Sequence, residues 1–258
     1  MALKWQPYRD EDNHGAWVLI LGGTAEARRL AGRLVDDGID VQTSLAGRVN
    51  EPRLPPGRVR IGGFGGAEGL AAWLALNRPA VVVDATHPFA GIMTASAARA
   101  ALATGIPLLR LHRPGWAARP GHDWRWVDTL AAAAAALDGF DSAFLTTGRQ
   151  GLRAFAGVSA HCLIRTVERP ETALPARSTL ILDRGPFRVA DEIALMLAHR
   201  VEVVVSKDSG GELTEAKLAA AHELMLPVIM VRRPALPRGV AVVESVDDAL
   251  AWTRTHLA

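Results

Sequence analysis

Residues 16–26 read AWVLILGGTAE and give the clearest indication of the fold. Its apolar run ends at Gly22, which is typical of a buried strand followed by a tight turn. Apolar residues then recur at helical spacing over residues 25–36, and Gly38 supplies a C-terminal stop. A buried strand, a glycine turn and an amphipathic helix form the first half of a parallel βαβ unit.

The same alternation of strand and helix continues along the chain. Strands are predicted to start at 39–41 and to span 59–61, 80–84 and 107–111, with helices at 66–76 and 91–103. After a break, further strands are predicted at 143–147, 161–167, 179–183, 201–206, 227–231 and 240–243, and helices at 129–137, 149–155, 188–198, 213–224 and 246–257. Strands that alternate with helices favour parallel sheets with right-handed crossovers. The predicted fold class is therefore α/β, with two Rossmann-like doubly wound lobes, mainly parallel sheets and a cleft between them.

Proline and glycine mark the boundary between the lobes. Residues 113–125 contain Pro114, Gly115, Pro120 and Gly121, which is typical of a hinge. The predicted segments are a flexible leader at 1–15, a dinucleotide-binding domain at 16–113, and a second, substrate-side domain at 114–258.

Composition excludes several classes of protein. Hydrophobic residues make up 49% of the 258 residues and charged residues 22%, which is ordinary for a globular chain. No apolar run is long enough to span a bilayer, and the N-terminal segment does not resemble a secretory signal, so we expect a cytoplasmic protein that does not bind membranes. The net charge of +2 is too small to predict nucleic-acid binding.

Residues that carry other kinds of chemistry are missing. The single cysteine, Cys162, and the scattered histidines predict neither a disulfide framework nor a metal site. The chain has no P-loop motif and no G-x-S-x-G nucleophile elbow. The only tyrosine, Tyr8, lies in the leader, so the Tyr/Lys pair of short-chain dehydrogenases, which reduce small carbonyl compounds, is missing.

Gly22, Gly23 and Thr24 follow the first strand and precede the first helix, and Glu26 lies in the first turn of that helix. In a Rossmann fold, glycines at this point let the backbone approach a pyrophosphate, while the helix N-terminus offers its N–H groups. These four residues are therefore candidate contacts of a dinucleotide. A tight turn capped by Thr24 is the alternative explanation.

The second strand indicates which dinucleotide is expected. NAD sites usually carry an acidic residue about 20 residues after the glycines, where it binds the ribose 2′-hydroxyl. Here residues 42–48 read QTSLAGR, with no acid before Glu51. Ser44 and Arg48 suit the 2′-phosphate of NADPH, and a solvated loop charge is the alternative for Arg48.

In the first half of the chain, two further loops each follow a predicted strand. The glycine run at 62–66 makes Gly63 and Gly65 candidate cofactor contacts, with a flexible loop as the alternative. The segment DATHPFA at 84–90 places Thr86 and His87 at the carboxyl end of a strand, where ligands of open α/β sheets gather. For His87 the alternative is a helix-capping role before Pro88 at the first helical position.

Three cationic loops end strands of the second half, at 146–149, 184–187 and 206–211. Because parallel strands end at the same edge of a sheet, we expect these loops to form a mouth that collects anions. The candidate substrate contacts are Thr147, Arg149, Arg184, Ser206, Lys207, Ser209 and Gly210. Lys207 is distinctive, since only three of the 29 basic residues are lysines. Solvated loop charges are the alternative for each loop taken alone.

Several motifs occur together in a specific order. They read GGTxE, SLAGR, GGFGG, DATHPFA, TTGR, RGPF and SKxSGG, followed by Thr214, Ala216-Lys217-Leu218 and Arg233-Pro234. Because these motifs follow one another in this order over residues 17–234, the chain resembles the precorrin-6A reductase family of cobalamin biosynthesis. That family includes the cobalt-precorrin-6A reductases. Members of that family often have Asn at the position of Asp208.

The resemblance implies NADPH-dependent reduction of a macrocycle double bond, which converts precorrin-6A to precorrin-6B. The nicotinamide would supply the hydride, with His87 and Lys207 as candidates for delivering the proton. The substrate would be an anionic tetrapyrrole, with a hand-over to neighbouring enzymes of the cobalamin pathway. The arginine-rich, aerobic-type composition favours the cobalt-free substrate. The alternatives are a cobalt-precorrin-6A reductase of the anaerobic pathway and a non-catalytic, NADP-sensing Rossmann module.

Overall fold

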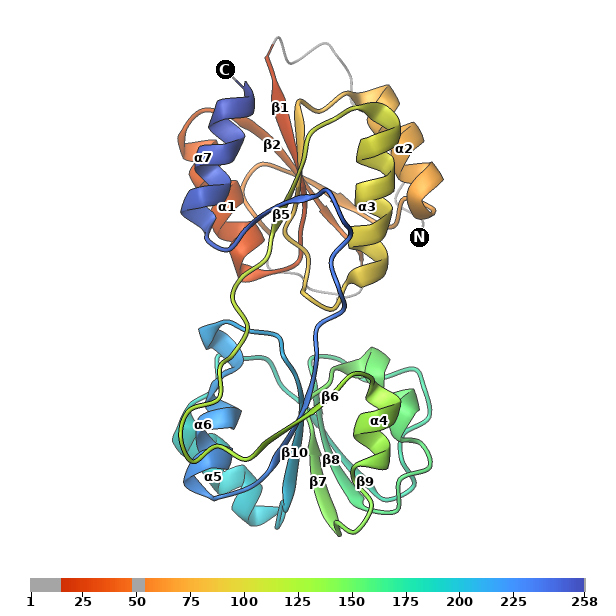
Figure 1. Cartoon of the computed structure of the whole chain (residues 1–258), viewed down its shortest axis with the longest axis vertical. Helices are drawn as coiled ribbons and strands as arrows, with labels where there is room; N and C mark the ends of the chain where they lie inside the picture. The colour runs from red at the N-terminus through yellow and green to blue at the C-terminus, as the bar shows by residue number, and fades with distance from the viewer. Residues whose placement is uncertain (1–14, 48–53, 258) are drawn as a thin grey trace. The chain divides into compact units, whose positions relative to one another are not determined.

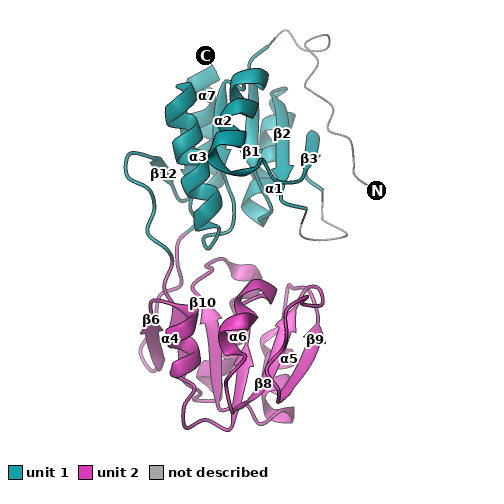
Figure 2. Ribbon diagram, turned by 90° about the vertical axis from the view of Figure 1, so that its right-hand side faces the viewer, with its two compact units in different colours: residues 1–113, 234–258 teal, residues 114–233 magenta. Residues whose placement is uncertain are grey.

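The computed structural model describes residues 15–47 and 54–257, which divide into two compact units (Figure 2). Within these residues, unit 1 contains 15–47, 54–113 and 234–257, and unit 2 contains 114–233. Arg48 and all of the predicted leader except Gly15 lie outside the described residues. No helix in the described part of the chain is both long and apolar enough to cross a membrane.

Unit 1 contains a parallel sheet with helices on both faces (Figure 1). Its strands are β1 (Trp17–Leu21), β2 (Asp40–Leu45), β3 (Arg58–Ile61), β4 (Val81–Asp84), β5 (Leu108–Leu111) and β12 (Ala241–Val243). Their order in space is β12-β5-β4-β1-β2-β3, the order of a Rossmann fold with β12 in the sixth place. Helices α1 (Ala25–Asp36) and α7 (Val246–Leu257) cover one face, and α2 (Gly66–Asn77) and α3 (Gly91–Thr104) cover the other.

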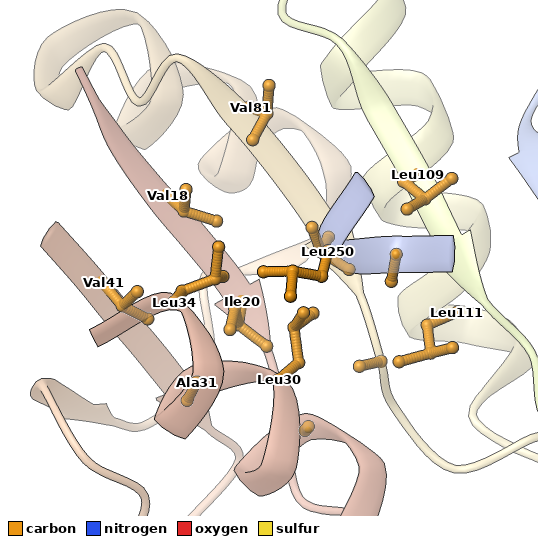
Figure 3. Packing of buried hydrophobic residues seen from close by; sticks show 14 residues of the cluster. Val18, Ile20, Leu30, Ala31, Leu34, Val41, Val81, Leu109, Leu111 and Leu250 are labelled. Carbon is orange, nitrogen blue, oxygen red and sulfur yellow. The ribbon is translucent and has the colours of Figure 1, made fainter. Parts of the chain in front are cut away.

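Strand β1 contributes to the hydrophobic core on both faces of this sheet. Val18 and Ile20 pack with side chains of α1 and α7 (Figure 3). Trp17, Leu19 and Leu21 pack with side chains of α2 and α3. Successive side chains of a strand point to opposite faces, so a sheet covered on both faces requires an unbroken apolar run such as this one.

Unit 2 repeats this architecture. Its strands are β6 (Trp124–Val127), β7 (Ser142–Leu145), β8 (His161–Thr166), β9 (Ser178–Leu182), β10 (Val203–Lys207) and β11 (Val228–Val231), in the order β6-β11-β10-β7-β8-β9. Helices α5 (Val189–Ala198) and α6 (Ala216–Glu223) pack against each other, as do α4 (Leu130–Ala135) and the 3-10 helix η2 (Arg149–Phe155). A second 3-10 helix, η3 (Glu212–Thr214), precedes α6.

The two units exchange their sixth strands. Strand β6 follows β5 in the chain but pairs with β11, whereas β12 follows β11 but pairs with β5. The predicted second domain, 114–258, therefore needs correction at its C-terminal end, because the described residues from 234 onward belong to unit 1. Helix α7 completes the core of unit 1 with Ala249 and Leu250, which are 0% and 2% exposed.

The predicted fold class, α/β with Rossmann-like parallel sheets, is confirmed. Three details differ from the predictions. Strand β6 begins inside the predicted hinge at 113–125, the segment 149–155 forms a 3-10 helix, and the helix predicted at 213–224 is divided into η3 and α6. Strand β6 lies at the edge of its sheet, and in its sequence, WRWV, an exposed Arg125 stands between two partly buried tryptophans, but the adjacent prolines and glycines concealed this strand.

Candidate functional site

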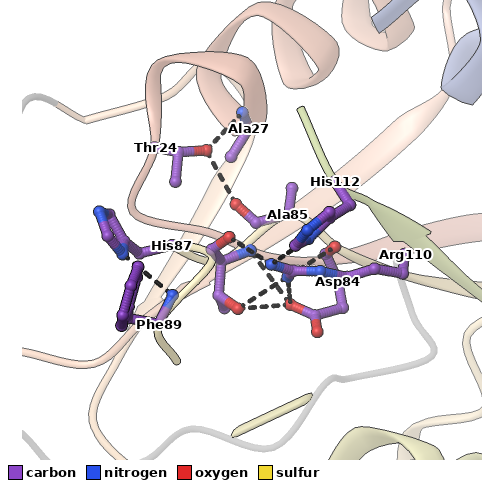
Figure 4. Close-up of polar contacts among 9 residues, drawn as sticks. Thr24, Ala27, Asp84, Ala85, His87, Phe89, Arg110 and His112 are labelled. Carbon is purple, nitrogen blue, oxygen red and sulfur yellow. Dashed lines mark hydrogen bonds and ion pairs between the residues drawn. The ribbon is translucent and has the colours of Figure 1, made fainter. Parts of the chain in front are cut away.

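The strand order of unit 1 reverses between β1 and β4, and the loops that follow these two strands are bonded to each other. Thr24 Oγ1 donates to the carbonyl oxygen of Ala85 at 2.8 Å and accepts from the backbone N–H of Ala27 at 3.1 Å (Figure 4). Thr24 is thus the N-cap of α1, as the alternative explanation required. Ligands of open α/β sheets bind outside the carboxyl ends of the strands at such a reversal point, which makes this edge the candidate cofactor site.

The glycine turn combines tight packing with open space. A Cβ on Gly22 would lie 2.6 Å from Thr43 Cγ2, so β2 leaves room only for glycine. Gly23 has a φ of +114°, and a Cβ there would meet no described atom within 4 Å. This open space lies at the N-terminus of α1, where the helix dipole and N–H groups attract an anion.

Glu26 forms an ion pair within unit 1. Its carboxylate contacts Arg113 at 2.7 Å and Arg29 at 3.5 Å. Burial raises the pKa of Glu26, but Arg113, a backbone hydrogen bond and Arg29 outweigh it and lower the pKa below its usual value. Glu26 lines one small cavity with Thr24 and Thr86, whose other walls are Ala85, Pro88, Leu111 and Arg113. The structure thus brings together three of the predicted cofactor residues.

A buried ion pair that sequence analysis missed supports the loop after β4. Arg110, 1% exposed, donates to Asp84 Oδ1 at 2.7 Å and to Thr86 Oγ1 and O at 3.0 and 3.1 Å (Figure 4). The hydroxyl of Thr86 in turn donates to Asp84 Oδ1 at 2.6 Å. Removing one partner of such a pair leaves an unpaired buried charge, at a cost of about 3–5 kcal/mol. An arginine inside the apolar strand LLRL was the sequence signal for this role.

His87 lies next to Thr86 with an exposed ring. Its Nδ1 accepts from the backbone N–H of Phe89 at 3.2 Å. Helix α3 begins at Gly91 with Ala90 as its N-cap, so the alternative that placed Pro88 at the first helical position is wrong. His87 instead stabilises the turn before the helix.

Arg60 is a second residue that sequence analysis missed. Strands β2 and β3 pair with Ser44 opposite Arg60, and Arg60 Nη1 donates to Ser44 Oγ at 3.3 Å. The guanidinium also donates to the carbonyl oxygens of Gly62 and Gly63 at 2.6 and 2.7 Å, and it stacks over the Phe64 ring at 3.9 Å. A positive charge therefore lies beside Ser44, where sequence analysis had expected Arg48.

Gly65 has a φ of +80° and is the N-cap of α2. A Cβ on Gly63 or on Gly65 would meet no described atom within 4 Å. The loop between β3 and α2 therefore leaves open space, as the loop between β1 and α1 does at Gly23.

Unit 2 has its own reversal point, between β7 and β10. The backbone N–H and the hydroxyl of Thr146 both donate to the carbonyl oxygen of Val205, at 3.0 and 2.9 Å. Thr147 and Ser206 are buried next to this junction, and the Ser206 hydroxyl donates to the carbonyl oxygen of Lys207 at 3.1 Å. Burial lowers the pKa of the Lys207 ammonium group.

The remaining cationic candidates are spread along the same edge. Arg149 pairs with Glu168 at 3.0 Å. Arg184 is exposed after β9, and its backbone N–H donates to Asp183 Oδ1 at 2.7 Å. Since neighbouring strands are about 4.8 Å apart, and β8 lies between β7 and β9, the ends of β7 and β9 are roughly 10 Å apart. The cationic candidates thus come from the carboxyl ends of three strands of one sheet, β10, β7 and β9.

The last two substrate candidates lie in the loop after β10. The backbone N–H of Ser209 donates to the carbonyl oxygen of Lys207 at 2.7 Å. Gly210 has a φ of +64°, and a Cβ there would overlap the carbonyl oxygen of Pro114. Glycine is required at position 210 because the backbone of Pro114 packs against the loop there.

Comparisons with known proteins agree with this architecture. The model of the precorrin-6x reductase family, CbiJ/CobK, matches residues 17–254. A precorrin-6A reductase from Rhodococcus erythropolis is 53% identical over 92% of this chain and 97% of its own, and one from Mycobacterium tuberculosis is 51% identical over 91% and 96%. The solved structure of CobK precorrin-6A reductase has a TM-score of 0.88 at 41% identity and covers 94% of this chain and 98% of its own. The match runs through both units and both candidate sites, and the chain belongs to the precorrin-6x reductase family.

Proposed function

We propose that this chain uses NADPH to reduce a double bond of the precorrin-6A macrocycle, giving precorrin-6B in cobalamin biosynthesis. The observation that carries the proposal is the candidate cofactor edge of unit 1, where an open glycine turn precedes α1 and the Arg60 guanidinium lies beside Ser44. Family membership supplies the class of substrate.

The described residues of unit 1 fit a dinucleotide phosphate. The open space at Gly23 and the N-terminus of α1 suit a pyrophosphate. Ser44 and Arg60, at the carboxyl ends of β2 and β3, suit a ribose 2′-phosphate at the point where NAD enzymes carry an acid. Arg48 stays a candidate for the same phosphate, and Gly63, Gly65 and Thr86 stay candidate contacts. When bound, NADPH would supply the hydride.

Unit 2 fits an anionic, partly apolar ring. Lys207 ends β10 and Arg149 lies after β7, the two strands of the reversal point, and both residues suit charge-assisted hydrogen bonds to carboxylates. Exposed apolar side chains follow or end the strands at the same edge: Val167, Leu182 and Leu213, with 46%, 49% and 49% of their surface exposed. Cations interspersed with apolar surface suit a macrocycle that carries carboxylates.

The reduction needs one proton in addition to the hydride, and His87 and Lys207 are the groups that we propose to deliver it. Burial lowers the pKa of Lys207, which makes its ammonium group a stronger acid than an exposed lysine. His87 is exposed at the carboxyl end of β4, beside the candidate cofactor contact Thr86.

The cobalt-free substrate is favoured by the identities of the relatives. A cobalt-precorrin-6A reductase from Priestia megaterium is 29% identical over 90% of this chain and 97% of its own, well below the 53% of the Rhodococcus precorrin-6A reductase. The alternative of a non-catalytic sensing module gains no support, because these relatives are named as reductases and match nearly the whole chain.

The test follows NADPH oxidation with precorrin-6A, with cobalt-precorrin-6A and without a substrate, and repeats the first reaction with NADH. We expect precorrin-6A and NADPH to give the highest kcat/KM, and precorrin-6B as the product. The Lys207→Ala variant should lose about ten- to a hundredfold in kcat/KM, because a desolvated charge-assisted contact contributes about 1.5–3 kcal/mol. Equal rates with and without precorrin-6A would refute the proposal.

A further inference from the structure

Both segments that connect the units run beside the loop at 206–211. The chain enters unit 2 at Pro114 and leaves it at Arg233. Asp208, in the middle of this loop, donates its backbone N–H to the carbonyl oxygen of Val231 at 3.0 Å. The loop therefore lies where the chain leaves the end of β11.

The Asp208 side chain contacts both connecting segments. Its Oδ1 accepts from the backbone N–H of Trp116 at 2.9 Å, and its Oδ2 lies 3.1 Å from Arg233 Nε. The side chains of Asp208 and Arg233 are only 11% and 12% exposed. Charge-assisted contacts that are shielded from water are stronger than those on an open surface.

Arg233 joins the two segments directly. Its Nε donates to the carbonyl oxygen of Asp208 at 2.8 Å, and its Nη2 donates to that of Pro114 at 3.0 Å. The first connecting segment, the loop and Arg233 pack so closely that glycine is required at two positions. A Cβ on Gly115 would lie 2.6 Å from Asp208 Oδ2, and a Cβ on Gly210 would lie 2.5 Å from Arg233 Nη2.

Trp116 attaches the first segment to the far end of the same loop. Its indole Nε1 donates to the carbonyl oxygen of Gly211 at 3.2 Å. The indole ring also lies 4.6 Å from Lys217 Nζ, on the first turn of α6. The loop is therefore bonded to the first segment at Asp208 and again at Gly211.

We infer that Asp208 is a positioning residue for the reaction: with Arg233 and Trp116 it forms a clasp that fixes the loop at 206–211. The inference rests on the proposed function, in which Lys207 of this loop contacts the substrate. One carboxylate oxygen of Asp208 contacts Trp116 and the other contacts Arg233. Asp208 therefore affects substrate binding by holding the loop in place. Arg233 also neutralises a carboxylate that would otherwise repel an anionic substrate.

The test compares Asp208→Ala and Asp208→Asn with the matched control Asp128→Asn. Asp128 pairs with Arg232, the neighbour of Arg233, at 3.1 Å, but both side chains are exposed. Three measurements are made: hydrogen exchange of the Trp116 amide, NADPH binding by fluorescence, which gives the dissociation constant, and steady-state kinetics with precorrin-6A, which give kcat and KM.

In Asp208→Ala we expect rapid exchange at Trp116, an unchanged NADPH dissociation constant, and a loss in kcat/KM on the order of ten- to a hundredfold, as misplaced binding groups cause. Asp208→Asn keeps an oxygen acceptor for Trp116 but loses the charge opposite Arg233, so it should recover part of this loss. Asp128→Asn should behave as the parent does in all three measurements.

Gly115→Ala is a second way to open the clasp, because it adds a Cβ 2.6 Å from Asp208 Oδ2 and leaves every charge in place. It should give the same kinetic defect, and it keeps the test decisive if Asp208→Ala does not fold. Rapid exchange at Trp116 with parental kcat/KM in Gly115→Ala, and in Asp208→Ala if that variant folds, would overturn the inference. Failure of the proposed function looks different, since the parent itself would then show no NADPH oxidation that depends on precorrin-6A.

Discussion

The two adjacent glycines after β1 differ in what surrounds them. Gly22 faces Thr43 Cγ2, which a Cβ would approach to 2.6 Å, whereas Gly23 faces open space. We expect Gly22→Ala to lower the free energy of unfolding by about 1–3 kcal/mol through overpacking. Because Thr43→Ser removes the opposing methyl group, the double variant should regain most of this loss. Urea unfolding of the two single variants and the double variant measures the coupling, and additive losses would show that the clash is not with Thr43.

Arg60 supports the second prediction at the residue scale. If its guanidinium binds the 2′-phosphate, Arg60→Ala should lower kcat/KM for NADPH by about ten- to a hundredfold, since charged hydrogen bonds contribute about 1.5–3 kcal/mol. The value for NADH should fall much less. Arg58→Ala is the control, because Arg58 lies on the same strand and its exposed guanidinium lies 4.0 Å from Asp40. Equal losses with both cofactors would mean that Arg60 merely supports the loop through Gly62 and Gly63.

At the scale of elements, α6 packs into unit 2 with a lysine in its first turn. Lys217 is 5% exposed, and burial, followed by the nearby Arg165, lowers its pKa from 10.5 to about 7, although Glu192 and Glu215 oppose the change. Between pH 7 and 10.5 the unfolded chain binds a proton at Lys217 that the folded chain does not bind. The Lys217 contribution to stability therefore increases as the pH rises through this window.

Lys217→Met removes this pH-dependent term. We expect the urea midpoint of the parent to rise more steeply between pH 7 and pH 10 than that of the variant. Lys207 shifts in the same direction, so the difference between the two curves isolates Lys217. Parallel curves would show that Lys217 is protonated in the folded protein throughout this range.

At the scale of the whole molecule, the exchange of sixth strands makes the two units unequal as fragments. Residues 114–233 contain every described strand of the second sheet, whereas residues up to 113 lack β12 and α7. Helix α7 also forms ion pairs with α1 and the residue after it, Arg33–Asp247 at 2.9 Å and Arg254–Asp37 at 2.6 Å.

We therefore expect a fragment of residues 114–233 to unfold cooperatively by itself, while a fragment ending at Arg113 should lack a stable core. Burial of a leucine such as Leu250 contributes about 1.5–3 kcal/mol, and unit 1 would lose the whole inner face of α7. Joining residues 234–258 to residue 113 through a short linker should restore folding and NADPH binding. Circular dichroism during heating distinguishes these fragments, and a stable 1–113 fragment would contradict the expectation.

Apart from β6, the succession of strands and helices and the loops at the carboxyl ends of the strands could be predicted from the amino-acid sequence. These features are local, because the spacing of apolar residues separates strand from helix and glycines mark the turns. Thr24, Thr86 and Lys207 can therefore be placed at strand ends from the sequence, although the sequence names no partner for any of them.

The sheets that β6 and β12 join, and the partners of Arg60, Arg110 and Asp208, follow from the three-dimensional structure and not from local sequence. Strands pair through backbone N–H and C=O groups that every residue type except proline carries, so the side chains of β12 do not specify β5 as its neighbour. A charged side chain likewise does not encode its partner: Arg110 lies 26 positions from Asp84, and Trp116 lies 92 from Asp208. Such contacts form only when the pairing of the strands, and the packing of the two segments that connect the units, bring residues that are distant in sequence close together.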